Sequence, residues 1–478
     1  MGGRSRSHPG RGRNLLAAPI LAAVVVGATL AACGQGTLRV RHGTTSASSA
    51  AGSTQPPTTV APADQWRTAW GSAMAWGYGE AVDTTVRQVA TVAVGGTALR
   101  VRLSNLYGNR PLMLGGVTVA PSGPRGSLAG PAETLLFGGE PTVAIPIGQE
   151  IYSDPLPMSV PAGQALAVSV FVRGPDLMTV HPCCESPLVS YFGGNGAGDL
   201  ITDASAGALP YSSPWSRLVD AVDVLSPAGP GVVILGDSIS DGYNSSGRWP
   251  ELLQQRIDLL PPADQVAVVN EAITANTLTV APRDDEEKGG GPPGLTRLAP
   301  DVIDLAGISD VVVLLGTNDL WFGAPASQLI AGYTQLASTL HSAGRRLFIA
   351  TLLPRRTGDE LWTSVQQAAL VQVDQWILGS GLFDGVIDLA PAVADVYNGA
   401  CQPDALYPAF DSGDHLHPDA AGDVALANAV PTALFGLPPA PQLAHPLMTP
   451  TPGCDTPGPG YPPPPIQGSG APGQPPGA

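Results

Sequence analysis

The chain has 478 residues, and its 59 Gly and 50 Pro make up about 23% of them, against ~12% in average proteins. Hydrophobic residues account for an ordinary 44%, which excludes a wholly disordered chain. The formal net charge of −16 argues against nucleic-acid binding, because phosphate backbones would be repelled. Five cysteines are too few to predict a disulfide framework or a Cys/His zinc cluster.

The amino terminus, residues 1–32, has the pattern of a bacterial signal peptide. Four arginines precede an apolar run over residues 15–32. The run ends in Leu-Ala-Ala-Cys at 30–33, which resembles a lipobox. The resemblance implies that Cys33 is lipidated and that the protein is held on the outer face of the cytoplasmic membrane. A plain signal peptide or a membrane-spanning anchor is the alternative. Loss of the four arginines would bring the net charge from −16 to −20, so lipid rather than charge would hold the protein at a membrane.

Composition divides the rest of the chain into four segments. Residues 33–65 are rich in Ser, Thr and Pro, which predicts a tether. Residues 438–478 are rich in Pro and Gly, which predicts a disordered tail. Two folded domains are expected between them, over 66–229 and 230–437.

Four cysteines remain once Cys33 is set aside, namely Cys183, Cys184, Cys401 and Cys454. A location outside the cytoplasm would permit disulfides between them. Three pairings are open, and the sequence does not choose among them. Adjacent cysteines such as Cys183 and Cys184 seldom pair with each other, because the geometry is strained.

Residues 66–229 are predicted to be all-β. Apolar residues alternate with other residues over 99–103 and 166–172, and turn-forming residues at 95–96 and 161–163 separate such runs. Short strands with regular turn signals are typical of a sandwich or jelly roll.

Residues 230–437 are predicted to form a parallel sheet with helices on both faces, because continuous apolar runs alternate with helix-like stretches. The apolar runs are 232–235, 266–269, 311–315, 347–353 and 386–389, and the helix-like stretches include 249–260, 325–343 and 363–378.

Three polar segments follow these runs. They read Gly-Asp-Ser at 236–238, Gly-Thr-Asn-Asp at 316–319 and Asp-His-Leu-His at 414–417. Ligands of open α/β sheets bind beyond the carboxyl ends of the strands, which makes these segments candidates for a site. We interpret Asp237 and Asp319 as residues that cap or orient nearby backbone.

These segments resemble the motifs of the SGNH hydrolases, also called GDSL esterases, over residues 230–437. The resemblance implies a flavodoxin-like three-layer α/β domain and a carboxylic ester hydrolase without cofactor or metal. It further implies that Ser238 is the nucleophile, that Asp414 and His417 complete a catalytic triad, and that Asn318 is an oxyanion donor.

The chemistry supports these roles independently. A serine hydroxyl is a weak nucleophile until a base takes its proton, and His417 is suited to that task. Asp414 can hold the other ring nitrogen. The backbone N–H of Ser238 and the side-chain amide of Asn318 can stabilise an oxyanion.

The segment 270–276 departs from the family, because Ala275 stands where a glycine is usual. The expected oxyanion donor is a backbone N–H, which alanine retains. Its methyl group could still crowd the site or demand a different backbone conformation.

Other assignments stay open at this point. His415 is the rival of His417 as the base, and Asp411 is the rival of Asp414. The acidic run at 284–287 is interpreted as a solvated loop rather than a metal site.

The β domain is similar to the β-sandwich that precedes the hydrolase domain in some actinobacterial members, on the segments 85–88, 100–105 and 153–155. The similarity implies a role in binding carbohydrate or in shaping the cleft. Four aromatic residues are candidates to stack on sugar rings, although packing is the commoner role: Trp66, Trp70, Trp76 and Tyr78.

Three functions are compatible with these patterns. The first is a cell-surface serine esterase that removes short acyl groups, of the acetyl type, from glycans or small molecules. The second is an acyltransferase with the same triad, and the third is a non-catalytic glycan-binding lipoprotein.

Overall fold

The computed structural model describes residues 64–182, 190–281, 290–355, 362–446 and 448–454. All of them belong to one compact unit, Val60–Ala478. The signal-peptide segment with Cys33, most of the tether, Cys183, Cys184 and the acidic run at 284–287 lie outside the described residues.

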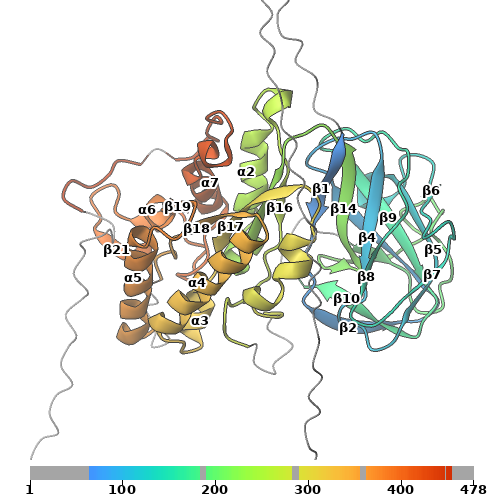
Figure 1. Ribbon diagram of the computed structural model, residues 1–478, viewed down its shortest axis with the longest axis horizontal. Coiled ribbons are helices and arrows are strands. Elements are labelled where there is room, and N and C mark those ends of the chain that lie inside the picture. Colours follow the sequence, from blue (N-terminus) through green and yellow to red (C-terminus); the bar gives the residue numbers. More distant parts are fainter. Residues whose placement is uncertain (1–63, 183–189, 282–289, 356–361, 447, 455–478) are drawn as a thin grey trace, which may run out of the picture. The chain divides into compact units, whose positions relative to one another are not determined.

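The first part of the unit is built from antiparallel strands (Figure 1). Their order is β1-β14-β4-β8 in one sheet, β13-β10-β2 in a second and β12-β11-β3-β9-β5-β6 in a third, where β7 also pairs with β5. The strands are β1 (Gln65–Gly71), β2 (Trp76–Ala81), β3 (Thr84–Thr91), β4 (Leu99–Ser104), β5 (Leu112–Pro121), β6 (Glu133–Thr134), β7 (Val143–Ile145), β8 (Glu150–Tyr152), β9 (Ala165–Val172), β10 (Asp176–His181), β11 (Ser190–Phe192), β12 (Tyr211–Ser213), β13 (Ser216–Arg217) and β14 (Val219–Ser226). The predicted β domain is confirmed as a region of antiparallel strands, and its sandwich or jelly-roll type stays a prediction.

The four aromatic candidates of this domain differ in exposure. Trp70 is buried, and the Arg100 guanidinium lies over the Trp66 ring at 4.8 Å. Tyr78 is 54% exposed, so among these residues it is the one whose ring is most open to solvent. Trp76 is partly buried against the core.

The second part is an α/β domain with a parallel sheet of order β16-β15-β17-β18-β19. Counted from its first strand, this is the order 2-1-3-4-5 of flavodoxin-like sheets. The parallel strands are β15 (Gly231–Gly236), β16 (Val268–Asn270), β17 (Ile308–Leu314), β18 (Arg346–Ala350) and β19 (Gly385–Ile387), and a small antiparallel pair is formed by β20 (Ala394–Asp395) and β21 (Gln402–Leu406). The helices are α1 (Ser238–Asp241), α2 (Trp249–Ile257), α3 (Thr317–Trp321), α4 (Ala326–Ser342), α5 (Ser364–Gly379), α6 (Ala390–Val393) and α7 (Ala420–Ala429). The predicted parallel sheet with helices on both faces is confirmed.

Alternation along the strands explains the continuous apolar runs. In β15, Val233 and Leu235 belong to the core on the α4 and α5 side, whereas Val232 and Ile234 belong to the core on the α2 and α7 side. These pairs of helices lie on opposite faces of the sheet (Figure 1). Both faces of the strand are therefore buried, and every position is apolar.

The β domain packs directly on the α/β domain through β1, which lies beside β16. Thr68 donates its backbone N–H to the Ala306 carbonyl at 2.8 Å, and its hydroxyl accepts the Ala306 N–H at 2.9 Å. A Cβ on Gly71 would lie 2.0 Å from a carboxylate oxygen of Glu271, so only glycine allows this close approach. Buried apolar residues of both domains form one continuous cluster.

The start predicted for the disordered tail, residue 438, is wrong, because residues 438–446 pack on the α/β domain. The Arg256 guanidinium donates to the carbonyls of Pro441 at 3.0 Å and Ala440 at 3.3 Å. The side chain of Asn428 exchanges two hydrogen bonds with the backbone of Leu443, at 2.9 and 2.8 Å. A Pro-rich segment has few N–H donors, but these side chains satisfy its carbonyl oxygens.

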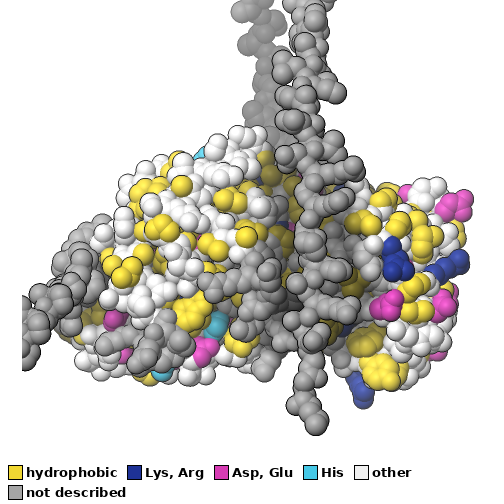
Figure 2. Space-filling model, turned by 90° about the horizontal axis from the view of Figure 1, so that it is seen from below, with side chains coloured by type: hydrophobic (Ala, Val, Ile, Leu, Met, Phe, Trp, Pro, Cys, Tyr) yellow, Lys and Arg dark blue, Asp and Glu magenta, His cyan; other side chains and the backbone are white. Residues whose placement is uncertain are grey.

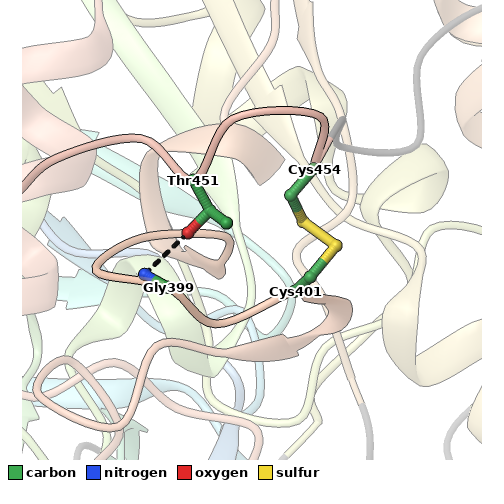
Figure 3. Close-up of a disulfide and its surroundings, with 4 residues drawn as sticks. All are labelled: Gly399, Cys401, Thr451 and Cys454. Atoms are coloured by element: carbon green, nitrogen blue, oxygen red, sulfur yellow. Dashed lines mark hydrogen bonds between the residues drawn. A yellow bond between two sulfur atoms is a disulfide. The ribbon is translucent and has the colours of Figure 1, made fainter.

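A disulfide joins Cys401 to Cys454, with 5.5 Å between the Cα atoms (Figure 3). Beside it, Gly399 donates its backbone N–H to the Thr451 hydroxyl at 2.9 Å. The sequence left three pairings open, and this is the pairing found. It ties the end of the described chain to the loop between β20 and β21.

No helix within the described part of the chain is long and apolar enough to span a membrane. On the face shown in Figure 2, charged side chains are sparse, and hydrophobic side chains are scattered among uncharged atoms. The low charge content of the sequence is therefore visible at this surface.

Candidate active site

Three neighbouring strands carry candidate residues beyond their carboxyl ends. Ser238 opens α1 after β15, and Asn318 lies in α3 after β17. Ala275 follows β16 by a short loop. Because β15 lies between β16 and β17, the loops after all three strands meet at the point where the strand order reverses.

The turn that presents Ser238 is sharp. A Cβ on Gly236 would lie 2.5 Å from the Ser240 side chain, so a glycine is needed there. The Asp237 carboxylate accepts the backbone N–H of Ile239 at 3.0 Å and caps α1. Burial raises the pKa of Asp237 to about 7. These contacts hold Ser238 at the start of the helix.

Ser238, His417 and Asp414 form a hydrogen-bonded chain. His417 Nε2 lies 2.8 Å from Ser238 Oγ, and His417 Nδ1 lies 2.6 Å from Asp414 Oδ2. A carboxylate only accepts, so Nδ1 carries the proton and Nε2 can accept the serine proton. Asp414 Oδ1 also accepts the backbone N–H groups of His417 at 2.8 Å and Leu416 at 3.0 Å.

The Asp414 carboxylate is held in its ionised form. Burial alone would raise its pKa, but the hydrogen bonds from the His417 ring and from the backbone outweigh burial and hold the pKa of Asp414 well below its usual range. An ionised partner fixes the tautomer of the imidazole and stabilises the imidazolium that forms when the base takes a proton.

Two residues after α1 complete this arrangement and were not found by sequence reasoning. Asn244 Nδ2 donates to Asp414 Oδ2 at 2.9 Å. The Tyr243 ring lies against the His417 ring, with 4.8 Å between their centroids. Asn244 has a φ of 58°, which asparagine tolerates better than most residues. The only sequence signal for the role of Asn244 was an asparagine shortly after the glycine that ends α1, and this signal is weak.

The rival residues form a separate pair on the same loop. His415 Nδ1 lies 2.6 Å from Asp411 Oδ2, and the His415 side chain is 58% exposed. His417, in contrast, is 7% exposed and faces Ser238. The geometry therefore favours His417 over His415 as the base and Asp414 over Asp411 as its partner.

Ala275 adopts the backbone conformation of the glycine that it replaces, with a φ of 59°. Its neighbour Thr274 donates both its backbone N–H and its hydroxyl to Asp241 Oδ2, at 3.0 and 2.7 Å. Neither the Ala275 N–H nor the Ser238 N–H has an acceptor among the described residues, so both remain available to an oxyanion.

The amide of Asn318 is positioned by the same loop. Its Nδ2 donates one hydrogen to the Asn276 carbonyl at 2.9 Å, which leaves the second hydrogen of that nitrogen for an oxyanion. Asp319 accepts the backbone N–H groups of Leu278 and Thr279, both at 2.7 Å. Asp319 thus orients the loop rather than the substrate.

A fully buried arginine joins the loops after β15 and β16. Arg297 donates to the Gly236 carbonyl at 3.2 Å, to the Glu271 carbonyl at 2.6 Å and to Asn276 Oδ1 at 3.1 Å. Its guanidinium also pairs with Asp301 at 2.8 Å. Nothing in the local sequence marks Arg297 for this role, because its partners lie 21 or more positions away along the chain, Asp301 excepted.

Within the described residues, no group of three or more His, Cys, Asp or Glu side chains is arranged to hold a metal ion. The arrangement at Ser238 offers instead a nucleophile, a base and preorganised N–H donors. These are the groups that acyl transfer requires.

Comparison with known proteins identifies the α/β domain. Residues 234–425 match the model of the GDSL-like lipase/acylhydrolase family. Similar solved structures include a carbohydrate acetylesterase family member from Sinorhizobium meliloti (20% identity, TM-score 0.34, 43% of this chain and 100% of that chain) and the M. smegmatis aryl esterase (15% identity, TM-score 0.35, 44% of this chain and 100% of that chain). No curated protein matches the chain significantly. Residues 234–425 are therefore a GDSL-like lipase/acylhydrolase domain, and this domain identifies the chain as an ester hydrolase of the SGNH type.

Proposed function

We propose that the chain is a cell-surface serine esterase that removes short acyl groups, of the acetyl type, from glycans or small esters. The observation that carries the proposal is the hydrogen-bonded chain of Ser238, His417 and Asp414, with 2.8 Å from Ser238 Oγ to His417 Nε2. Two N–H donors and the Asn318 amide lie on the adjoining loops.

In the proposed cycle, His417 Nε2 takes the hydroxyl proton while Ser238 Oγ attacks the carbonyl carbon of the ester. The oxyanion that forms accepts hydrogen bonds from the backbone N–H groups of Ser238 and Ala275 and from Asn318. His417 then gives its proton to the leaving alcohol. Water then attacks the acyl-enzyme as His417 takes one of its protons; the ester bond to Ser238 Oγ breaks, and His417 returns the proton to Ser238 Oγ.

The burial of the reactive groups supports a small acyl group. Ser238 is 5% exposed, His417 is 7% exposed and Asn318 is 8% exposed. An acyl carbon must come within bonding distance of an almost fully covered hydroxyl, which long or branched chains do less easily than acetate.

Two features support a location outside the cytoplasm. The segment 1–32 resembles a lipoprotein signal peptide, and Cys33 is the proposed lipidation site. The disulfide between Cys401 and Cys454 fits an oxidising compartment, where such bonds persist. A lipid at Cys33 would hold the enzyme at the membrane.

The test is hydrolysis of p-nitrophenyl esters from acetate to decanoate by the wild type, Ser238→Ala and His415→Ala. We expect turnover that is fastest with acetate, vanishes in Ser238→Ala and persists in His415→Ala, because among the described residues the exposed His415 ring pairs with Asp411 and not with Ser238. Equal activity of the wild type and Ser238→Ala would refute the proposal. Faster turnover of decanoate would refute the short-chain part alone.

A further inference from the structure

A histidine of the β domain reaches the helix that carries the nucleophile. His181, the last residue of β10, is 1% exposed. Its Nε2 lies 3.2 Å from Asp241 Oδ1, and its Nδ1 lies 2.7 Å from the Ala73 carbonyl oxygen. Asp241 is the last residue of α1, which begins at Ser238.

The two hydrogen-bond partners of His181 leave two possible positions for the proton that His181 and Asp241 share. A carbonyl oxygen and a carboxylate oxygen are both acceptors, so both ring nitrogens of His181 must donate, or Asp241 must hold the proton that they share. In the first arrangement the hydrogen bond is charge-assisted and stronger than a neutral one, and in the second the Asp241 O–H donates to His181 Nε2. Arg248 lies 3.8 Å from the same Asp241 oxygen and favours the ionised carboxylate.

The other oxygen of Asp241 holds the oxyanion loop. It accepts the backbone N–H and the hydroxyl of Thr274, at 3.0 and 2.7 Å. The Thr274 carbonyl accepts the Gly290 N–H at 2.7 Å. Because a trans peptide is planar and its N–H points away from its C=O, these contacts set the direction of the Ala275 N–H.

This loop needs such support, because Ala275 is an L-residue at a φ of 59°. That conformation costs an L-residue energy that glycine does not incur. The surrounding contacts must therefore keep Ala275 from relaxing to a negative φ.

We propose that His181 is a positioning residue of the esterase: through Asp241 and Thr274, the β domain holds Ala275 so that its N–H points at the oxyanion. The inference rests on the proposed function. It assigns the β domain a part in the chemical step, in addition to any part in binding substrate.

The first readout is steady-state hydrolysis of p-nitrophenyl acetate by His181→Phe, with Arg67→Ala as the matched control. Arg67 packs against Gly307 and donates to Ala228, so it lies in the same contact between domains but at the amino ends of the strands. We expect His181→Phe to lower kcat about 10-fold with KM within about twofold, and Arg67→Ala to leave both unchanged. An unchanged kcat in His181→Phe, or an effect on KM alone, would overturn the inference.

The second readout does not depend on activity. Hydrogen–deuterium exchange of peptides that cover residues 272–278 should be faster in His181→Phe than in the wild type and unaltered in Arg67→Ala. Unaltered exchange in both variants would overturn the inference even if the enzyme had no esterase activity. If the wild type did not hydrolyse the ester but exchange were faster in His181→Phe, the proposed function would be refuted. The positioning of the 272–278 loop by His181 would still hold.

Two further variants separate positioning from folding. Thr274→Val removes one donor to Asp241 on the hydrolase side of the contact and should lower kcat even if His181→Phe does not fold. In the Ala275→Gly background, His181→Phe should cost a smaller factor in kcat, because glycine adopts a positive φ without support. Equal factors in both backgrounds would show that His181 does not act through Ala275.

Discussion

Replacing Ala275 by glycine should stabilise the protein or leave its stability unchanged, although an Ala→Gly change usually destabilises a protein. The reason is its backbone, which has a φ of 59°. An L-residue in the left-handed region costs roughly 1–2 kcal/mol relative to its ordinary conformation, and glycine relieves that cost. The N–H that points to the proposed oxyanion site is kept.

The magnitude follows from a comparison of two alanines. Glycine makes the unfolded chain more flexible, which costs about 0.5–1 kcal/mol at any position. At Ala275 the relieved strain opposes this cost. At Ala263, which is exposed and has no positive φ, nothing opposes it. The difference between the two variants therefore measures the strain itself, and we expect about 1–2 kcal/mol.

The assay is thermal unfolding of the wild type, Ala275→Gly and Ala263→Gly under identical conditions. Ala275→Gly should raise the midpoint or leave it unchanged, and Ala263→Gly should lower it. Ala275 is half-buried, whereas Ala263 is exposed. Loss of the methyl contacts therefore destabilises Ala275→Gly more than Ala263→Gly, which works against the predicted difference. If Ala275→Gly lowered the midpoint as much as Ala263→Gly, the argument from strain would be wrong.

Three other predictions test the site and its surroundings. Asn318→Ala should lower kcat by about 100- to 1,000-fold with little change in KM, measured with p-nitrophenyl acetate; a loss confined to KM would contradict its role at the oxyanion. Asn244→Ala removes the 2.9 Å hydrogen bond to Asp414 and should lower kcat about 10-fold, and an unchanged kcat would contradict its role. Burial raises the pKa of Asp423 to about 8, so the folded carboxyl keeps a proton that the unfolded chain releases above about pH 4. The protonated Asp423 carboxyl therefore contributes stability that is fully present below the pKa of the unfolded state and is lost as pH rises through the pKa of the folded state. Between the two, the free energy of unfolding should fall by up to ~1.4 kcal/mol per pH unit. Asp423→Asn should flatten this slope in unfolding measured from pH 5 to 9, and an identical slope would refute the assignment.

The strands of the α/β domain could be predicted from the sequence because they are buried on both faces, which requires apolar residues at successive positions. The ends of the strands were harder to predict. The run at 347–353 predicted a strand to its last residue, but β18 ends at Ala350. Leu352 and Leu353 are buried in the loop that follows, so their apolar character reports burial rather than strand geometry.

The residues that act through side chains were readable only where a local motif contains them. Ser238, Asn318, Asp414 and His417 lie in such motifs, and the structure brings them to one place. Arg297 has no local signature, since its role depends on carbonyls of distant loops.

Composition also fails to predict order where a few polar side chains hold a segment in place. Residues 438–446 belong to a segment with the Pro and Gly content of a disordered tail. They are nevertheless packed, because Arg256 and Asn428 bond their backbone. Asn428 lies 15 residues before its partner Leu443, but Arg256 lies 185 residues before Pro441, and its sequence context is that of an ordinary surface residue of an amphipathic helix.

The alanine in place of glycine and the buried histidine of the β domain have a common physical explanation. A glycine at position 275 could present its N–H without support, whereas alanine at a φ of 59° requires a loop held on both sides. Asp241 supplies one side through Thr274, and His181 fixes Asp241. Separating the α/β domain from the β domain would therefore remove more than a possible binding surface: it would remove the His181 contact to the Asp241 carboxylate and expose the apolar cluster that the domains share. If His181 acts as proposed, the catalytic unit of this chain is both domains together.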